Sequence, residues 1–233
     1  MKDKPLGGKS YGSIPHLSQS RLGVSDSHVH AGQELILTKK ARDKHDEIFV
    51  FEKVDGTNVS VANIDGAVIP LIRAGYTAFE SKHLHHRMFA DWVFTNPSLF
   101  KGLKEGQRLC GEWLAMTHGI RYAIDNPIQG FVCFDLIYKN TRLPIEQLFA
   151  YTEPRGITTA KLLHRGSPIA VEKADKLLGD HGSHGAKDRA EGVVYRVERK
   201  GEFDFMAKNV RSDFVAGRYF DQDLWNFRIH YKR

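Results

Sequence analysis

The sequence has 233 residues and a formal net charge of +6, and its 41% hydrophobic and 27% charged residues are ordinary for a soluble globular protein. The longest apolar runs, such as 48–51 and 131–134, are far too short to cross a bilayer, and no apolar signal-peptide core follows the N-terminus. These properties exclude a helical membrane protein and predict one large domain in the cytoplasm, with no membrane contact.

The cysteine count and the charge bear on the compartment and the partner. The only cysteines, Cys110 and Cys133, lie in apolar segments and predict buried free thiols in a reducing cytosol. The positive charge mildly favours a polyanionic partner. The C-terminal stretch 214–233 interleaves rings and cations, which suits phosphates and stacked bases, although we expect the rings themselves to pack on the domain. Its members are Arg218, Tyr219, Trp225, Phe227, Arg228, Tyr231, Lys232 and Arg233.

Hydrophobic periodicity and turn residues predict the secondary structure. Asp-Gly pairs at 55–56 and 65–66 separate apolar runs and are strong hairpin signals. A glycine-rich loop covers 179–185. We expect an α+β fold with mostly antiparallel sheets and flanking helices. In chain order, the expected elements are helix 38–45, strands 47–53, 58–64 and 67–73, helix 81–94, strands 108–114 and 131–137, helix 171–178, and a closing strand pair, 191–198 and 203–210.

The most informative motif is the run KVDGTN at residues 53–58. It follows an apolar strand, so Lys53 is expected at a strand end beside a tight turn, where partial burial lowers the pKa of its amine. A neutral amine is the nucleophile that covalent nucleotidyl transfer requires. Asp55 projects to the same side of the extended chain and can meet this amine. Taken alone, a surface lysine and aspartate at a hairpin is the simpler interpretation.

Further matches follow in order along the chain: Arg73-Ala74-Gly75, Gly111-Glu112-Trp113, Phe134-Asp135, Glu191-Gly192-Val193-Val194 and Lys208. Together with residues 53–58, they resemble the motifs of the covalent nucleotidyltransferase superfamily of polynucleotide ligases and messenger-RNA capping enzymes. The closest resemblance is to the RNA ligase family, of the nick-sealing type, and it covers about residues 47–211. Each match is weak alone, whereas the ordered set is strong.

The resemblance implies a nucleotidyltransferase (ATP-grasp-like) ligase catalytic domain that uses ATP with Mg²⁺ or Mn²⁺. In it, Phe134 would stack on the base, Glu112 would hold the ribose hydroxyls, and Glu112 and Glu191 would bind the metal. The residues with implied catalytic roles are Lys53, Asp55, Glu191 and Lys208. Those with implied roles in binding ATP are Glu52, Lys53, Asn58, Arg73, Glu112, Phe134, Glu191 and Lys208.

Two departures from the family pattern affect the prediction. The distal motif usually has two lysines, but here the first position is Met206, and Arg211 or Arg196 is expected to substitute. In addition, too few residues precede residue 47 or follow Lys208 for an OB-fold or another accessory domain. We therefore expect residues 1–233 to form a single nucleotidyltransferase domain. A protein partner, or the basic tail, would then help to hold the polynucleotide.

Two groups of histidines have no place in these motifs. His83 and His86 lie on one face of the predicted helix 81–94 with His85 beside them, but no carboxylate or thiol set completes a zinc pattern. We expect a solvated polar face there. His181 and His184 lie in the glycine-rich loop, which we expect to close over the substrate.

Taken together, the resemblance implies an ATP-dependent RNA ligase. Such an enzyme forms a covalent lysyl-AMP adduct, transfers AMP to a 5′-phosphate end of RNA, and seals that end to a 3′-hydroxyl. One alternative is the same chemistry directed to GTP-dependent capping or to a DNA nick. Another is a catalytically idle nucleic-acid-binding module that keeps the fold.

Overall fold

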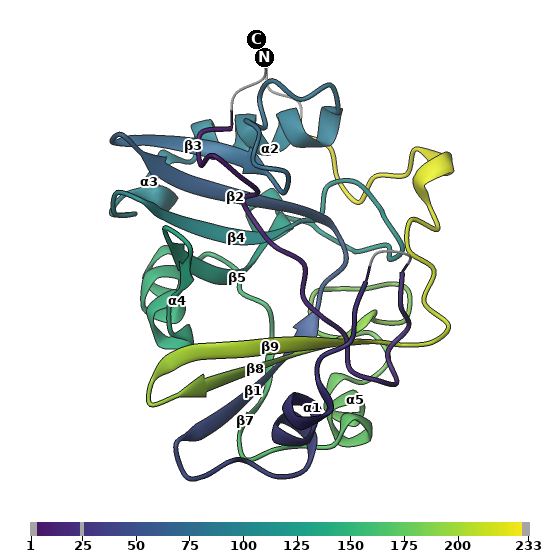
Figure 1. Ribbon diagram of the computed structural model, residues 1–233. Helices are drawn as coiled ribbons and strands as arrows, with labels where there is room; N and C mark the ends of the chain where they lie inside the picture. Colours follow the sequence, from purple (N-terminus) through teal and green to yellow (C-terminus); the bar gives the residue numbers. More distant parts are fainter. Residues whose placement is uncertain (1–3, 24–25, 230–233) are drawn as a thin grey trace.

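Two antiparallel sheets face each other across a cleft. The computed structural model describes residues 4–23 and 26–229 (Figure 1). Sheet A has the strand order β7-β1-β8-β9, and sheet B has the order β3-β2-β4-β5-β6. The strands of sheet A are β1 (Asp46–Lys53), β7 (Leu162–Gly166), β8 (Gly192–Arg199) and β9 (Glu202–Val210). Those of sheet B are β2 (Thr57–Ile64), β3 (Ala67–Ile72), β4 (Gln107–Trp113), β5 (Phe131–Tyr138) and β6 (Thr141–Arg142). The predicted α+β class is confirmed.

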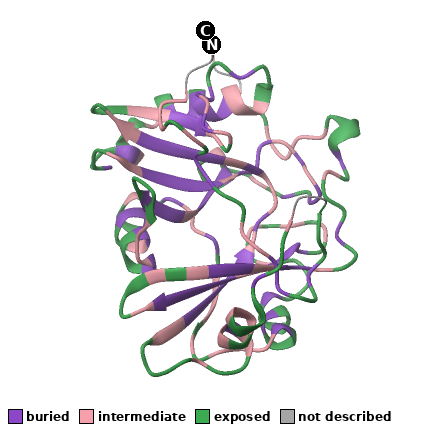
Figure 2. Cartoon of the chain, in the orientation of Figure 1, coloured by how far each residue is buried: buried purple, intermediate pink, exposed green. Residues whose placement is uncertain are grey.

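Helices flank both sheets, and the two largest hydrophobic clusters lie on opposite faces of β1. Alternate residues of β1 point to opposite faces, so Phe49 and Phe51 join one cluster while Ile48 and Val50 join the other. The first cluster lies between the sheets and under α2, and the second lies between sheet A and helices α1 and α5 (Figure 2). The helices are α1 (Ala31–Thr38), α2 (Leu84–Thr95), α3 (Pro97–Phe100), α4 (Ile145–Thr152) and α5 (Val171–Leu178), with short 3-10 turns at η1 (Pro127–Gly130), η2 (Glu153–Arg155) and η3 (Phe220–Gln222). None of the described helices has the length and hydrophobicity of a transmembrane span.

The two Asp-Gly turns have different roles. Asp65 and Gly66, with φ of 52° and 76°, connect β2 to β3 as the predicted hairpin. The hairpin predicted at Asp55 and Gly56 is wrong, because β1 and β2 belong to different sheets. The Asp55 carboxylate accepts backbone N–H groups from the loop after β4, which directs the chain across to sheet B.

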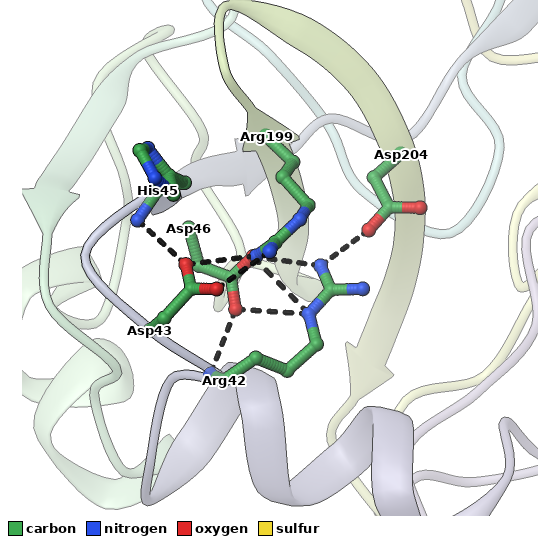
Figure 3. A network of polar contacts seen from close by, with 6 residues as sticks. All are labelled: Arg42, Asp43, His45, Asp46, Arg199 and Asp204. Atoms are coloured by element: carbon green, nitrogen blue, oxygen red, sulfur yellow. Dashed lines mark hydrogen bonds and ion pairs between the residues drawn. The ribbon is translucent and has the colours of Figure 1, made fainter.

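The helix predicted at 38–45 is also wrong, since α1 ends at Thr38. The following residues bind one another through side chains. Asp46 accepts the main-chain N–H of Arg42 at 2.8 Å, and Asp43 accepts that of His45 at 2.8 Å, contacts that compete with helical hydrogen bonds. Arg199 then pairs with both aspartates, and Asp204 pairs with Arg42, which ties this segment to the β8–β9 hairpin (Figure 3).

The C-terminal rings pack on the domain, as predicted. Phe214 and Tyr219 are buried, and Trp225 and Phe227 pack against the cluster between the sheets. Asn226 donates a hydrogen bond to the carbonyl of Leu114 at 2.7 Å, which fixes this segment beside the end of β4. The remaining members of the basic tail, Tyr231, Lys232 and Arg233, lie outside the described residues.

A buried ion pair joins the two sheets. Arg196 of β8 and Asp135 of β5 are each 1% exposed, and their side chains meet at 2.7 Å. Asp135 also accepts a hydrogen bond from Tyr11 at 2.6 Å and pairs with Arg142 at 3.0 Å, while Arg196 donates to Glu198 at 2.8 Å. Every charge in this network therefore has a partner, which sets the distance between the sheets.

The N-terminal strap, residues 10–17, closes one side of the cleft. Ser10 donates its N–H to the carbonyl of Arg73 beside β3, and Ser10 Oγ donates to the carbonyl of Ile72. Farther along, Lys208 of β9 donates its N–H to Pro15 and accepts that of Leu17. In Figure 1 this dark purple segment passes from sheet B to sheet A. The strap, together with α1, α4, β6 and β7, was not predicted from the sequence.

We predict that Arg196→Ala destabilises the fold by about 3–5 kcal/mol, because it leaves the buried Asp135 carboxylate without its main partner. Urea unfolding of the purified protein measures this loss. Arg165→Ala is the matched control: it removes a partly exposed arginine of sheet A whose partners, Glu47 and Glu146, are also partly exposed, so we expect a much smaller loss. Equal losses in the two variants would contradict a special role for the buried pair.

Candidate active site

Lys53 lies where the chain passes from sheet A to sheet B. It is the last residue of β1, opposite Gly192 of β8, and residues 54–56 lead directly into β2. A cavity of about 500 Å³ opens between the sheets, and both sheets and the N-terminal strap line it. A cavity of this size accommodates a nucleotide.

Lys53 and Glu191 form the central contact of the cavity. The Lys53 Nζ donates to Glu191 Oε2 at 2.7 Å, and the Glu191 side chain is buried. Gly192 explains why Glu191 is held there: its φ is +153°, and a Cβ would lie 2.0 Å from the carbonyl oxygen of Asn209. Only glycine therefore allows β9 this close to the start of β8.

The electrostatics of Lys53 differ from the sequence-based expectation. Burial lowers the pKa of its amine, but the carboxylates of Glu191 and Glu112 outweigh that effect and raise the pKa above its ordinary value. The predicted lowering is therefore wrong for the ligand-free site. At neutral pH Lys53 is therefore an ammonium ion, and a group of this kind is nucleophilic only after it loses its proton.

Glu112 faces Lys53 from sheet B. It lies opposite Asn58 in the β2–β4 register, and Asn58 Nδ2 donates to Glu112 Oε1 at 3.2 Å. The other oxygen, Oε2, is buried and has no hydrogen-bond partner among the described residues. Burial raises the pKa of Glu112 to about 8 and that of Glu191 in the same direction. An unpartnered carboxylate oxygen of this kind favours a cation.

Asp55 does not replace Glu191 as the partner of the amine. Its Oδ2 accepts N–H groups from Gly119 at 2.6 Å and from Ile120 at 3.0 Å, and its own N–H donates to the Tyr122 hydroxyl. Burial raises the pKa of Asp55 and the nearby Lys53 charge opposes that rise. Asp55 therefore anchors the crossing between the sheets and lies within the electrostatic reach of Lys53.

Two cations border the same cavity. Lys208 of β9 is mostly buried, and its Nζ lies 3.6 Å from Asp26 Oδ1. Burial lowers the pKa of Lys208, and the Lys53 charge lowers it further because the two ammonium groups repel each other across the cavity. Arg73 is exposed and donates to Ser13 of the strap at 3.1 Å. A phosphate group between these cations would be attracted to each of them.

The other end of the cavity is apolar. Phe134 is half-buried, lines the cavity and packs edge-on against Tyr11 with ring centroids 5.0 Å apart. Met206 lies beside the Tyr11 hydroxyl, and Val194 and Phe51 complete the wall. This end offers a planar, apolar space next to the charged one, as an aromatic base requires.

Neither arginine expected to substitute for the absent lysine has a free guanidinium. Arg196 lies directly opposite Met206 and lines the cavity, but it already binds Asp135, Glu198 and the carbonyl of Leu143. Arg211 donates to the main chain of residues 189 and 190 and pairs with Asp213. On β9, Lys208 therefore presents its charge to the cavity.

Glu52 lies along the cavity wall, but its carboxylate binds elsewhere. Successive residues of a strand point to opposite faces, so the Glu52 side chain turns away from that of Lys53. It accepts the N–H of Ser183 at 2.7 Å, and its Oε2 lies 3.9 Å from His184 Nε2. Burial raises the pKa of Glu52 to about 7. The glycine-rich loop therefore supports the strand beneath Lys53, and its predicted closure over substrate stays a prediction.

The surroundings of the histidines at the start of α2 were predicted only in part. His83 is exposed, whereas His85 and His86 are half-buried and line the cavity, so the solvated face expected for His86 is wrong. His118, which the sequence analysis did not single out, lines the same wall. Tyr11 and the strap were missed as well, because irregular segments carry no periodic signal. Within the described residues, no three His, Cys, Asp or Glu side chains are arranged to hold a metal ion.

We predict that Glu191→Gln lowers the pKa of Lys53, because the variant keeps the shape but removes the carboxylate that opposes the effect of burial. An NMR titration of the Lys53 side chain, assigned with Lys53→Ala, measures the shift. Glu105→Gln removes the same charge from a residue before β4 whose carboxylate accepts the N–H of Asp65 in the β2–β3 turn. This variant should leave the pKa of Lys53 unchanged. An unchanged or higher pKa in Glu191→Gln would show that Glu191 does not control the amine.

Comparison with known proteins agrees with this geometry. An archaeal ATP-dependent RNA ligase (form 1) superposes with a TM-score of 0.52 at 21% identity, over 87% of this chain and 48% of that chain. Two Naegleria gruberi RNA ligase mutants match with TM-scores of 0.55. The mutant with AMP and Mn is 15% identical over 87% of this chain and 57% of that chain. The mutant with ATP and Mn is 14% identical over 87% of this chain and 58% of that chain.

These structural likenesses show the shared fold, and the chain spans about half the length of the solved chains. No curated protein matches the sequence. The sequence itself matches the RNA ligase family over residues 46–210, well over half of the chain. The chain therefore belongs to the RNA ligase family.

Proposed function

We propose that the chain is the catalytic part of an ATP-dependent RNA ligase that works through a covalent lysyl-AMP adduct. The observation that carries this proposal is the contact of Lys53 Nζ with Glu191 Oε2 at 2.7 Å beside a nucleotide-sized cavity that Glu112 and Lys208 also line. Membership of the RNA ligase family supports the proposal, and so does the likeness to RNA ligases solved with AMP or ATP.

The apolar and charged ends of the cavity suit the two halves of ATP. We assign the adenine to the apolar end, stacked on Phe134, and the ribose hydroxyls to Glu112 and its partner Asn58. The phosphates then lie toward Lys208 and Arg73, which offset their negative charge. Glu52 takes part as a positioning residue for β1, because its carboxylate binds Ser183.

Glu112 and Glu191 fit a divalent cation, since the buried Oε2 of Glu112 lacks a hydrogen-bond partner among the described residues. Two carboxylates suffice for Mg²⁺ or Mn²⁺ when waters and substrate phosphates complete the coordination. Bound there, such an ion would lower the pKa of Lys53 and neutralise charge on the phosphates.

In the first step, Lys53 Nζ attacks the α-phosphorus of ATP. An N–P bond forms as the bond to the bridging oxygen of the β-phosphate breaks, and pyrophosphate leaves with that electron pair. Glu191 accepts the hydrogen bond of the ammonium in the ligand-free site and is placed to take its proton. Lys208 stabilises the charge on the phosphate oxygens as the transition state forms.

The second and third steps move AMP from the protein to RNA. A 5′-phosphate oxygen of the RNA attacks the α-phosphorus of the adduct, the N–P bond breaks, and Lys53 regains its amine. A 3′-hydroxyl then attacks the RNA 5′-phosphorus, AMP leaves, and a phosphodiester bond forms. The covalent adduct divides one difficult reaction into easier ones.

We also propose a cytoplasmic location, supported by Cys110 and Cys133, which are buried free thiols. The single-domain organisation of residues 1–233 and the protein partner stay predictions.

We predict that the wild type becomes labelled by α-³²P-ATP with Mg²⁺, whereas Lys53→Ala does not, because no other amine takes the place of the nucleophile. Glu191→Ala and Lys208→Ala should reduce labelling by about 100-fold or more. Gel electrophoresis under denaturing conditions measures the adduct. Lys139→Ala, at an exposed turn, is the control and should label fully. Labelling by α-³²P-GTP instead of ATP, or undiminished labelling of Lys53→Ala, would contradict the proposal.

A further inference from the structure

Three histidines from two separate segments meet at the wall of the cavity. His85 and His86 belong to the first turn of α2, and His118 follows β4. The ring centroid of His85 lies 4.2 Å from that of His86 and 6.4 Å from that of His118. All three line the cavity. The neighbouring His83 is exposed and does not line the cavity, although its ring centroid lies 5.5 Å from those of His85 and His86. We call His85, His86 and His118 the histidine trio.

Local hydrogen bonds leave donors free in the trio. Ser81 Oγ accepts the N–H of His83, so its own proton is available for His86 Nδ1 at 2.7 Å. His86 Nε2 then carries the ring proton and has no partner among the described residues. His118 Nε2 forms a hydrogen bond with Thr57 Oγ1 at 2.9 Å, and its Nδ1 has no hydrogen-bond partner among the described residues. His85 has no hydrogen bond to any described residue. The trio therefore offers uncommitted ring nitrogens.

The surroundings of the trio favour an anion. Burial lowers the pKa of His85 to about 4 and that of His86 to about 3, and the other charges that lower them further belong to histidines. Burial also lowers the pKa of His118 to about 4. The rings are thus neutral N–H donors at neutral pH. The first turn of α2 has no acidic residue, and its N-cap makes no side-chain hydrogen bond, so its backbone N–H groups add to the attraction for an anion.

The position of the trio indicates which anion it binds. Thr57, the partner of His118, begins β2 four positions after Lys53, and Arg73, which directly follows β3, lines the same cavity. The trio therefore extends the charged end of the cavity outward from the nucleophile. Beside it lies Phe220, whose ring is 49% exposed and 4.8 Å from that of His118. An exposed ring next to phosphate donors suits a nucleotide, which has both a phosphate and a base, better than a free pyrophosphate.

We propose that the histidine trio binds a backbone phosphate of the RNA strand close to its reacting end, with Phe220 as a stacking surface for the adjoining base. This inference rests on the proposed function and names the subsite that holds the polynucleotide. It requires no contact between the trio and ATP. The trio therefore acts in RNA binding and in the transfer of AMP to RNA, after the adduct has formed.

The test measures RNA binding directly. Fluorescence anisotropy with a 5′-phosphorylated, 3′-labelled RNA oligonucleotide gives Kd for the full chain and its variants. We expect the double change of His85→Ala with His86→Ala to raise Kd by about tenfold, the loss of one or two hydrogen bonds to phosphate. His83→Ala is the matched control, because it removes an exposed histidine of the same helix end, and its Kd should equal that of the wild type. Unchanged binding in the double variant would overturn the proposal.

A second readout separates RNA from pyrophosphate. Labelled adduct is isolated, and its loss is followed after addition of pyrophosphate or of 5′-phosphorylated RNA. We expect the double variant to react normally with pyrophosphate and slowly with RNA. The reverse pattern would assign the trio to pyrophosphate and overturn the RNA subsite. If the double variant is unfolded by circular dichroism, Phe220→Ala takes its place, with weaker RNA binding and normal reaction with pyrophosphate expected.

The two proposals fail in different ways. A wild type that forms no adduct contradicts the ligase function, while the anisotropy measurement still tests the trio. A wild type that forms the adduct but binds RNA no more tightly than the double variant contradicts the trio alone.

Discussion

The buried ion pair between Arg196 and Asp135 fixes how the two sheets stand relative to each other, and the geometry of the site depends on it. Burying two charges costs as much as their attraction returns, so such a pair adds little net stability. A displaced sheet, however, would leave either charge unpaired in an apolar region, which is strongly unfavourable. The pair therefore fixes the relative position of the two sheets more than it adds to stability. Tyr11 and Arg142 complete the partners of Asp135. It holds Lys53 on one sheet opposite Glu112 on the other.

At that fixed distance, Glu191 and Glu112 keep the Lys53 side chain in its protonated form, which is not nucleophilic. Glu191 binds the Lys53 ammonium and, with Glu112, raises its pKa, so the amine is held in place but is protonated. The same carboxylates suit a divalent cation, and a cation bound to them would no longer stabilise the ammonium. In the proposed function, binding of a divalent cation and deprotonation of Lys53 would therefore be coupled, because both involve Glu112 and Glu191.

Those parts of the molecule that depend on local pattern were predicted from the sequence, and those that depend on long-range contacts were not. The strand ending at Lys53, the β2–β3 hairpin and helix α5 follow from an apolar run, an Asp-Gly turn and helical periodicity, and all three are present. The turn at Asp55 looked like a second hairpin because its partners, the N–H groups of Gly119 and Ile120, are far away in sequence. The pKa of Lys53 was misjudged for the same reason, since Glu191 lies 138 positions away. No local signal marked the strap or His118.

Charge balance explains why a site with the unusual Met206 needs groups beyond its motif residues. The cations facing the cavity, Lys53, Arg73 and Lys208, are offset by Glu112 and Glu191, and Arg196 is neutralised by Asp135 and Glu198. The cavity is therefore not strongly positive, although a triphosphate and an RNA end both carry several negative charges. The histidine trio beyond Thr57 would add hydrogen-bond donors for the proposed RNA phosphate without adding positive charge, since its rings are neutral at neutral pH.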